Sequence, residues 1–97
     1  MKNFQNIKEI IRKNKKSFFQ KFKIKELSVF GSFVRGKQTR DSDVDILVDF
    51  SEPVDFFTFL DLEEYLSKLL RRKVDLVSRK ALKPRIGKFI LEEMVLV

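Results

Sequence analysis

The run VDILVDF at residues 44–50 alternates apolar and acidic side chains and is followed by Ser51, Glu52 and Pro53. Such alternation is typical of a β-strand that buries one face and exposes the other. The polar residues and the proline behind it mark its end. Residues 44–50 are therefore predicted to form a strand in a sheet that has one buried face.

The rest of the chain divides into segments with helix or strand periodicity. Apolar residues that recur every three or four positions indicate amphipathic helices, and Asp55 is placed to cap the second of them. Pro84 suits the first turn of the last helix. We predict helices over residues 3–21, 56–70 and 84–93, and strands over 24–30, 44–50, 73–78 and, in short form, 94–97. This order implies an α+β fold in which helices cover one face of a small mixed β-sheet.

The length of 97 residues fits a single domain, residues 1–97. Its charge is uneven, because residues 1–25 hold nine Lys or Arg and only one acidic residue, Glu9, whereas residues 41–64 hold nine carboxylates and no Lys or Arg. We expect a basic N-terminal helix over residues 1–23 and a core over 24–97 that carries the candidate chemistry. Nucleic-acid binding by the basic helix is an alternative, but a solvated helix face explains the charge equally well and is favoured.

The composition excludes several kinds of active site. The chain has no Cys, His or Trp, which removes disulfides, thiolate or imidazole zinc sites and histidine-based triads. Any catalysis must use carboxylates, hydroxyls, amines and bound metal ions. Because no run approaches the ~18 apolar residues of a membrane span, we expect a cytoplasmic protein with no membrane partner.

Gly31 and Ser32 follow the predicted strand 24–30, where a helical turn is expected over residues 33–36. A glycine lets the backbone approach a phosphate, and free amides at the start of a helix favour anions. Arg35 lies one turn further along and can bind the same phosphate. We therefore predict a phosphate site at Gly31, Ser32 and Arg35.

Three Asp residues are predicted to lie beside this turn. Asp43 and Asp45 share one face of their strand because they are two residues apart, and Asp75 interrupts the apolar strand 73–78. Carboxylates this close repel one another, and divalent cations relieve the repulsion. Magnesium is commonly held by carboxylates together with substrate phosphates, and two such ions can assist an in-line phosphoryl displacement. All three Asp residues are thus candidate Mg²⁺ ligands and catalytic residues, and Asp75 could also accept the proton of an attacking hydroxyl.

Gly31-Ser32, followed by Asp43-Val44-Asp45 and then by Asp75, resembles the signature of the polymerase-beta-type nucleotidyltransferases. The segments GSFVRGKQTRDSDVDILVDF and VDLVSRKALKPRIGKFILEE resemble more closely the minimal nucleotidyltransferases, or MntA-like proteins. The resemblance covers residues 24–97 and implies a polymerase-beta-like fold and ATP as substrate. It also implies that Gly31 and Ser32 hold nucleotide phosphate, that Asp43 and Asp45 bind magnesium, and that Asp75 completes the metal site or acts as base. Arg35 matches the arginine of the GSxxRG segment of the family.

The same resemblance implies a protein partner. Minimal nucleotidyltransferases are commonly paired with HEPN-domain ribonuclease toxins, and an antitoxin of this kind transfers AMP from ATP to a tyrosine hydroxyl of the toxin. Two alternatives stay open: an antitoxin that acts by binding alone, and a nucleotidyltransferase that acts on RNA or a small molecule. The adjacent pairs Phe18-Phe19 and Phe56-Phe57 offer apolar positions for docking, because two neighbours cannot easily share one helix face. The alternative is a core that wraps around both sides of a helix.

Overall fold

The structure, a computed structural model, describes residues 3–97 and has one mixed sheet with helices on both sides of it. Lys2, part of the predicted basic helix, lies outside the described residues. No helix in residues 3–97 is both long and apolar enough to cross a membrane. In chain order the elements are α1 (Phe4–Phe18), β1 (Ile24–Phe30), α2 (Ser32–Arg35), β2 (Val44–Phe50), α3 (Phe56–Leu70), β3 (Val74–Ser78), the 3-10 turn η1 (Arg79–Ala81), α4 (Pro84–Glu93) and β4 (Val95–Leu96).

The four strands lie side by side in the order β3-β2-β1-β4. β2 pairs antiparallel with β1 and parallel with β3, and the short β4 pairs antiparallel with β1. The predicted small mixed sheet of an α+β fold is therefore confirmed. The predicted bounds of β1, β2, α3 and α4 match the structure, whereas β3 begins one residue later than predicted and β4 spans two residues instead of four.

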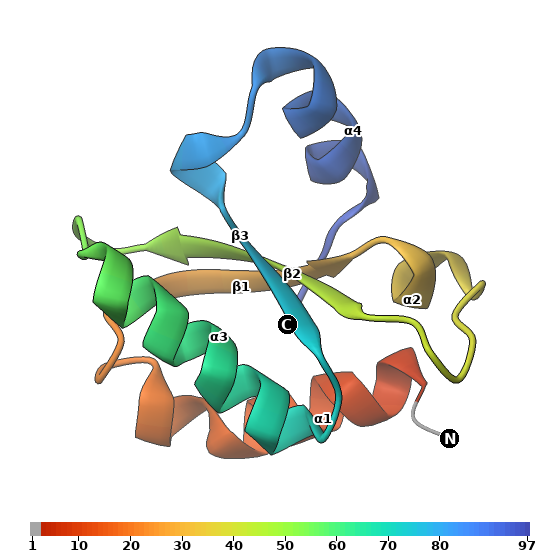
Figure 1. The fold of residues 1–97 in the computed structure, drawn as a ribbon, viewed down its shortest axis with the longest axis horizontal. Helices are drawn as coiled ribbons and strands as arrows, with labels where there is room; N and C mark the ends of the chain where they lie inside the picture. Colours follow the sequence, from red (N-terminus) through yellow and green to blue (C-terminus); the bar gives the residue numbers. More distant parts are fainter. Residues whose placement is uncertain (1–2) are drawn as a thin grey trace.

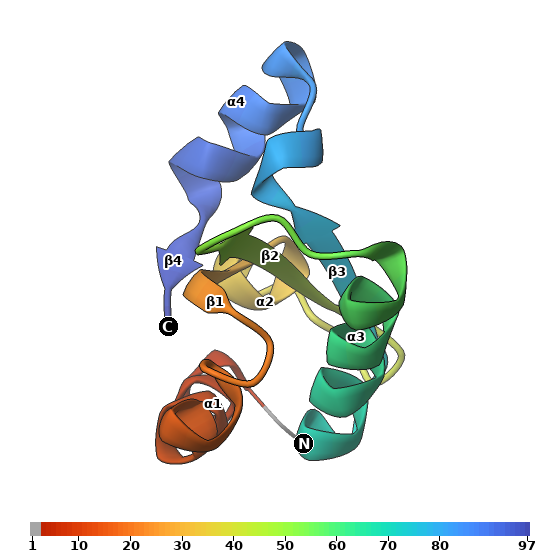
Figure 2. The same cartoon turned by 90° about the vertical axis from the view of Figure 1, so that its left-hand side faces the viewer.

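The hydrophobic core lies between one face of the sheet and the helices α1 and α3, which run beneath it in Figure 2. Each helix buries side chains at steps of about four residues, as expected for an amphipathic helix that packs on a sheet. The strands β1, β2 and β3 bury alternate side chains on the same side. The core residues from these elements include Ile7, Ile11, Phe18, Leu62, Leu66, Leu70, Leu27, Val29, Val44, Ile46 and Val48.

Side-chain caps fix where the two core helices begin. The Asp55 carboxylate accepts the backbone N–H of Thr58 at 2.7 Å, which confirms the predicted cap of α3. Asn3 and Asn6 form a reciprocal capping box at the start of α1, with the Asn6 N–H 3.0 Å from the Asn3 side-chain oxygen. These bonds satisfy amide groups that the first turn of a helix leaves unpaired.

The first helix is shorter than its apolar periodicity predicts. α1 ends at Phe18, and residues 19–23 form turns in which Lys23 adopts a left-handed backbone conformation with φ of 57°. Phe22 is still buried, and its ring centroid lies 5.6 Å from that of Tyr65 on α3. The periodicity extends beyond the helix because the turn also delivers a side chain to the core.

The last helix lies on the other side of the sheet from α1 and α3 (Figures 1 and 2). The prediction that the helices cover one face is therefore wrong for α4. The chain leaves β3 at one edge and returns as β4 at the opposite edge, so the connecting segment passes over the face that α1 and α3 leave open. Only Gly87 of α4 is buried, and Ile86 and Phe89 are 62% and 73% exposed.

Candidate active site

The sheet brings the predicted site residues together at one end. Because β1 runs antiparallel to β2 and β2 runs parallel to β3, the C-terminal end of β1 lies beside the N-terminal ends of β2 and β3. In this register Phe30 pairs with Asp45, and Asp45 pairs in turn with Asp75. Asp45 therefore lies between the glycine turn that follows β1 and the carboxylate on β3.

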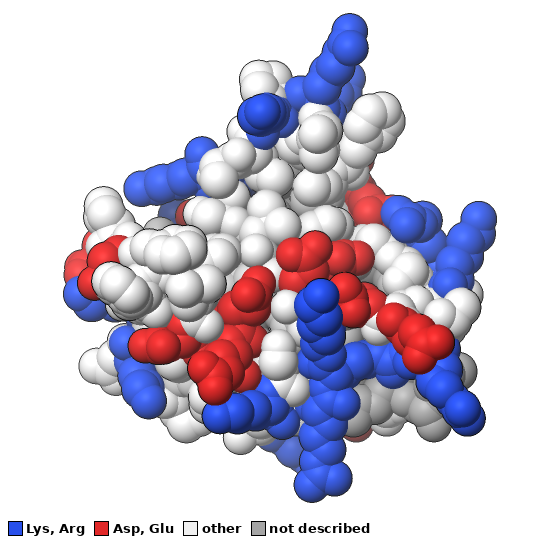
Figure 3. All heavy atoms as spheres, in the orientation of Figure 1, with Lys and Arg blue, Asp and Glu red and all other residues white. Residues whose placement is uncertain are grey.

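Acidic side chains form a band over β2 and β3, with Lys and Arg side chains around it (Figure 3). Asp75 is exposed. The Asp43 side chain is 43% exposed, and its Oδ2 lies 3.8 Å from the Nζ of Lys73. Both carboxylates are thus accessible to a ligand or a cation from solvent.

Gly31 lies so close to Asp45 that a side chain at this position would require the Asp45 carboxylate to shift. Its φ is +79°, and a Cβ at this position would lie 2.1 Å from Oδ2 of Asp45. The turn continues into the single helical turn α2, which Gly36 ends with φ of 70°. The helical turn was predicted one residue later than it occurs, and Ser32 is its first residue.

The charge state of Asp45 reflects its position in the acidic band. Burial first, and then the negative charges of Asp75 and Asp43, raise the pKa of its carboxyl group to about 6. The Arg35 guanidinium opposes this effect by lowering the pKa. The three predicted carboxylates therefore interact electrostatically, and a cation among them would relieve their repulsion.

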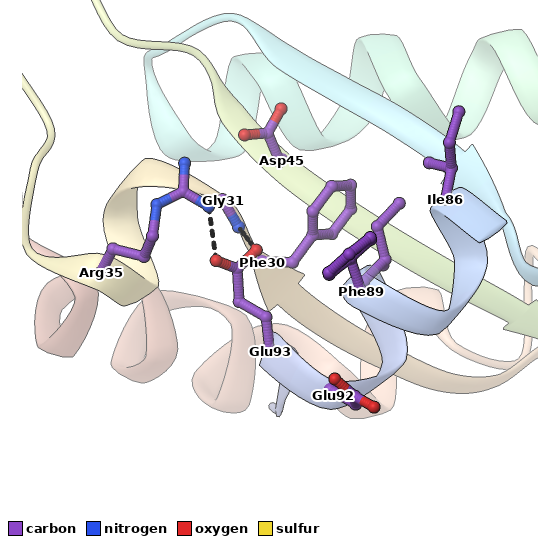
Figure 4. A pocket seen from close by; sticks show the side chains of 9 residues that line it. Phe30, Gly31, Arg35, Asp45, Ile86, Phe89, Glu92 and Glu93 are labelled. Carbon is purple, nitrogen blue, oxygen red and sulfur yellow. Dashed lines mark hydrogen bonds and ion pairs between the residues drawn. The ribbon is translucent and has the colours of Figure 1, made fainter.

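The structure adds Glu93, the last residue of α4, which the sequence analysis did not single out. Its Oε2 accepts the backbone N–H of Gly31 at 2.9 Å, and its Oε1 accepts a hydrogen bond from Arg35 Nη1 (Figure 4). The hydrogen bond from Gly31 and then that from Arg35 hold the pKa of Glu93 below its ordinary value. Residues 31 and 93 are 62 positions apart, so no local pattern could have indicated this contact.

A second addition is Arg72, which lies just before β3. Its Nε donates to the carbonyl of Ser42 at 2.8 Å, and its Nη2 donates to the carbonyls of Thr39 and Arg40. The guanidinium carbon also lies 5.1 Å from the ring centroid of Phe33 on α2. Arg72 therefore fixes the loop that connects α2 to β2 and that carries Asp43 at its end. In the sequence Arg72 stands among other charged residues just before a strand, and this pattern does not indicate such a role.

A cavity of about 670 Å³ opens beside the acidic band. Gly31, Arg35 and Asp45 line one part of it, and Ile86 and Phe89 of α4 line another (Figure 4). Ligand sites of nucleotide size generally have volumes of about 300–1,000 Å³ and combine an apolar lining with a few polar groups. The cavity therefore offers polar anchors and an apolar wall to one bound molecule.

The three predicted metal ligands do not converge on a single point. Within residues 3–97, no group of three Asp, Glu, His or Cys side chains is placed to hold a metal ion. Magnesium needs only one or two carboxylates when substrate phosphates supply its other oxygen ligands. The hard oxygen donors of Asp43 and Asp45 fit that requirement, and the negative charge of Asp43 is one of those that raise the pKa of Asp45.

Comparison with known proteins identifies a nucleotidyltransferase domain over nearly the whole chain. The model of the nucleotidyltransferase domain matches residues 11–97. A protein from Methanocaldococcus jannaschii, provisionally named as a protein adenylyltransferase, is 49% identical over 98 residues. The match covers 100% of this chain and 100% of that protein. The protein adenylyltransferase MntA of Thermococcus cleftensis is 46% identical over 97 residues, which cover 100% of this chain and 98% of that protein.

Solved structures resemble the fold as well. A protein provisionally described as a minimal nucleotidyltransferase has a TM-score of 0.77 and 30% identity, over 94% of this chain and 95% of that chain. A toxin–antitoxin complex with AMP-PNP has a TM-score of 0.74 and 25% identity, over 94% of this chain and 71% of that chain. A tri-AMPylated HEPN toxin of Shewanella oneidensis in complex with MNT antitoxin has a TM-score of 0.68 and 20% identity, over 93% of this chain and 70% of that chain. At this identity the similarity concerns the fold alone. The chain therefore belongs to the nucleotidyltransferase domain family and is a minimal nucleotidyltransferase of the MntA-like, polymerase-beta-type group.

Proposed function

We propose that this chain transfers AMP from ATP to a hydroxyl group, that of a tyrosine, on a partner HEPN-type ribonuclease toxin, and so acts as the antitoxin. The observation that carries the proposal is the contact between Gly31 and Asp45, with Asp75 paired to Asp45 on the next strand. This arrangement joins a candidate phosphate turn to a set of carboxylates. The relatives named as protein adenylyltransferases, and the solved toxin–antitoxin complexes, support the choice of reaction and of partner.

The reaction requires one bond to form and one to break at the α-phosphorus. The acceptor oxygen bonds to this phosphorus, the bond from phosphorus to the pyrophosphate oxygen breaks, and the acceptor proton passes to a base. Gly31, Ser32 and Arg35 would bind the phosphates of ATP. Asp75, which is exposed on the edge strand β3, would receive the proton from an acceptor that approaches from solvent.

Magnesium would stabilise the negative charge that builds up on the phosphate oxygens during this step. Asp43 and Asp45 would hold it, and Asp75 would complete the set or act as the base described above. The repulsion that raises the pKa of Asp45 supports this role, since a cation between the carboxylates removes that repulsion.

Neutralisation of the toxin by binding alone is the second candidate. It draws on the exposed apolar side chains Phe56, Phe57 and Phe89, which are 67%, 75% and 73% exposed and could contact another protein without any chemistry. A polynucleotide or small-molecule acceptor is the third candidate. It would use the Lys and Arg side chains of α1 or the apolar part of the cavity.

The deciding experiment measures the intact mass of the partner toxin after incubation with this chain, magnesium and ATP. The inactive variant carries Asp43→Asn and Asp45→Asn together. Asp49→Asn is the matched control, because Asp49 lies on the same strand and pairs with Glu26, away from the glycine turn. We expect the toxin to gain AMP with the original chain and with the control, and to gain none with the double variant.

Two other outcomes would replace the proposal. A tight complex in which the toxin gains no mass would favour neutralisation by binding alone. Transfer of AMP to RNA in place of the toxin, with RNA binding that weakens steeply as salt increases, would favour a polynucleotide acceptor.

A further inference from the structure

The carboxylate of Glu93 holds two of the three residues that the proposed function assigns to nucleotide phosphate, Gly31 and Arg35. Its two oxygens accept one hydrogen bond each, from the Gly31 N–H at 2.9 Å and from the Arg35 guanidinium. Figure 4 shows Glu93 reaching from the end of α4 toward the turn after β1, with its carboxylate between these two groups. A carboxylate with two accepting oxygens presents much the same pattern to these donors as two oxygens of a phosphate.

A phosphate and the Glu93 carboxylate cannot occupy the same donors together. The backbone N–H of Gly31 has one hydrogen to donate, and Glu93 already accepts it. An incoming phosphate would also meet a second negative charge at hydrogen-bond distance from its own position. Glu93 is 23% exposed on its side chain and contributes to the negative field at Asp45.

We propose that Glu93 is an internal competitor for the phosphate position, and that a nucleotide must displace its carboxylate from Gly31 and Arg35 in order to bind. This inference rests on the proposed function, because it takes these two residues as phosphate ligands. Glu93 is then a residue that sets nucleotide affinity, in addition to the residues that hold the nucleotide.

The attachment of α4 allows such a displacement. Among the residues of α4, only Gly87 is buried, and the strand β4 that follows Glu93 pairs with β1 at just two positions. Beyond β4, Val97 is buried in the core and donates its N–H to the Leu27 carbonyl at 2.9 Å, so the end of the chain stays anchored without the contacts of Glu93. Exchanging them for contacts with a phosphate would disturb few other interactions of the fold.

The test compares the affinity of full-length variants for ATP by titration calorimetry, once with magnesium and once with EDTA. Glu93→Gln keeps the length and one accepting oxygen but removes the charge. Glu64→Gln is the matched control, because it removes the same charge from an exposed ion pair with Lys68 on α3 and Glu64 does not line the cavity. We expect Glu93→Gln to bind ATP on the order of two- to tenfold more tightly than the original chain, and Glu64→Gln to change affinity by less than about twofold.

A second variant and a second measurement guard against misfolding. Glu93→Asp keeps the charge but shortens the side chain, so it should weaken the contact with Gly31 and also tighten ATP binding. In an amide NMR spectrum the three glycines are few enough to follow individually, and the Gly31 signal of the original chain should move when ATP is added.

The outcomes separate the two proposals. If the original chain binds ATP but both Glu93 variants bind it equally or more weakly, the competitor role is wrong and Glu93 positions the turn instead. An unmoved Gly31 signal in ATP-bound protein would also overturn the competitor role. If neither the original chain nor the variants bind ATP, the proposed function itself fails and this inference fails with it.

Discussion

At Gly31, a backbone angle and a side-chain contact impose the same requirement for glycine. The φ of +79° is strained for any residue with a Cβ, and that Cβ would lie 2.1 Å from Asp45 Oδ2. Gly31→Ala should therefore lower the free energy of unfolding by about 2–4 kcal/mol and abolish AMP transfer. Urea denaturation and the mass assay described above measure the two effects.

Gly36 provides the control for this substitution. Its φ of +70° imposes a similar backbone cost, but no atom lies within 4 Å of a Cβ built there. Gly36→Ala should cost only about 1 kcal/mol. Equal losses for both variants would show that the contact with Asp45 contributes nothing beyond backbone strain.

The raised pKa of Asp45 predicts how stability depends on pH. Its pKa of about 6 in the folded chain exceeds the value of about 4 in an unfolded chain, so between these pH values the folded state binds more protons. The contribution of Asp45 to stability is therefore most favourable below about pH 4 and is lost as the pH rises through 6. Because the side chain is half-buried and screened by solvent, we expect a loss of about 1 kcal/mol rather than the full value of the shift.

The measurement is urea denaturation of the original chain and of Asp45→Asn, in EDTA, between pH 4 and pH 7.5. The variant should be more stable by about 1 kcal/mol at pH 7.5, and the difference should vanish near pH 4. Asp49→Asn is the control. A difference between Asp45→Asn and the original chain that stays constant with pH would show that Asp45 is not destabilised by its neighbours in the folded state.

On the scale of elements, α3 protects the exposed edge of the sheet. β3 is the last strand on its side, and two of its outward-facing N–H groups are accepted by α3 side chains. Leu76 donates to Glu63 Oε2 at 2.9 Å, and Val74 donates to Ser67 Oγ at 3.0 Å. An unpaired edge strand offers a template for association with another chain, so these bonds stabilise the fold and also block edge pairing.

Glu63→Ala tests this role of α3. We expect it to lower the free energy of unfolding by about 1–2 kcal/mol and to increase self-association, because the Leu76 N–H is left unpaired. Glu64→Ala is the control, since Glu64 forms an exposed pair with Lys68 on the same helix at 2.9 Å and should change stability by less than about 0.5 kcal/mol. Sedimentation velocity at several concentrations measures association, and two monomeric, equally stable variants would contradict the prediction.

On the scale of the whole molecule, the two Phe pairs serve different surfaces. The expectation that one member of each pair is left for docking is wrong for Phe18 and Phe19, because Phe18 is buried and Phe19 packs against it with 5.2 Å between ring centroids. Phe56 and Phe57, at the start of α3, are both mostly exposed. The first pair belongs to the core, and the second is available for an interaction outside the chain.

Substitution of one member of each pair separates folding from surface function. Phe18→Ala should cost about 3–5 kcal/mol of stability, because it leaves a cavity beneath the sheet. Phe57→Ala should change stability by less than about 0.5 kcal/mol. Thermal unfolding of both variants measures the difference, and a large loss in Phe57→Ala would mean that this side chain also supports the fold.

Much of the secondary structure was predictable from residue patterns. Helix periodicity, the Asp55 cap, Pro84 at the start of α4 and the alternation in β2 are local signals, and the element bounds they gave agree closely with the structure. The carboxylates of the site could be nominated too, because Asp43 and Asp45 are close in sequence and Asp75 stands out in an apolar strand. The prediction that each of these residues acts in binding or catalysis still awaits the experiments above.

Contacts between segments that are distant in the sequence could not be predicted from residue patterns. Glu93 reaches Gly31 across 62 positions because β4 pairs with β1 and so places the end of α4 over the glycine turn. Arg72 reaches the carbonyls of residues 39–42 because β3 lies parallel to β2. Side-chain periodicity reports which face of an element is buried, whereas strand order and helix placement determine which buried or polar groups meet. The chain pattern therefore specified the elements and the acidic residues, and the folded arrangement alone revealed that the Glu93 carboxylate accepts hydrogen bonds from two residues predicted to bind phosphate.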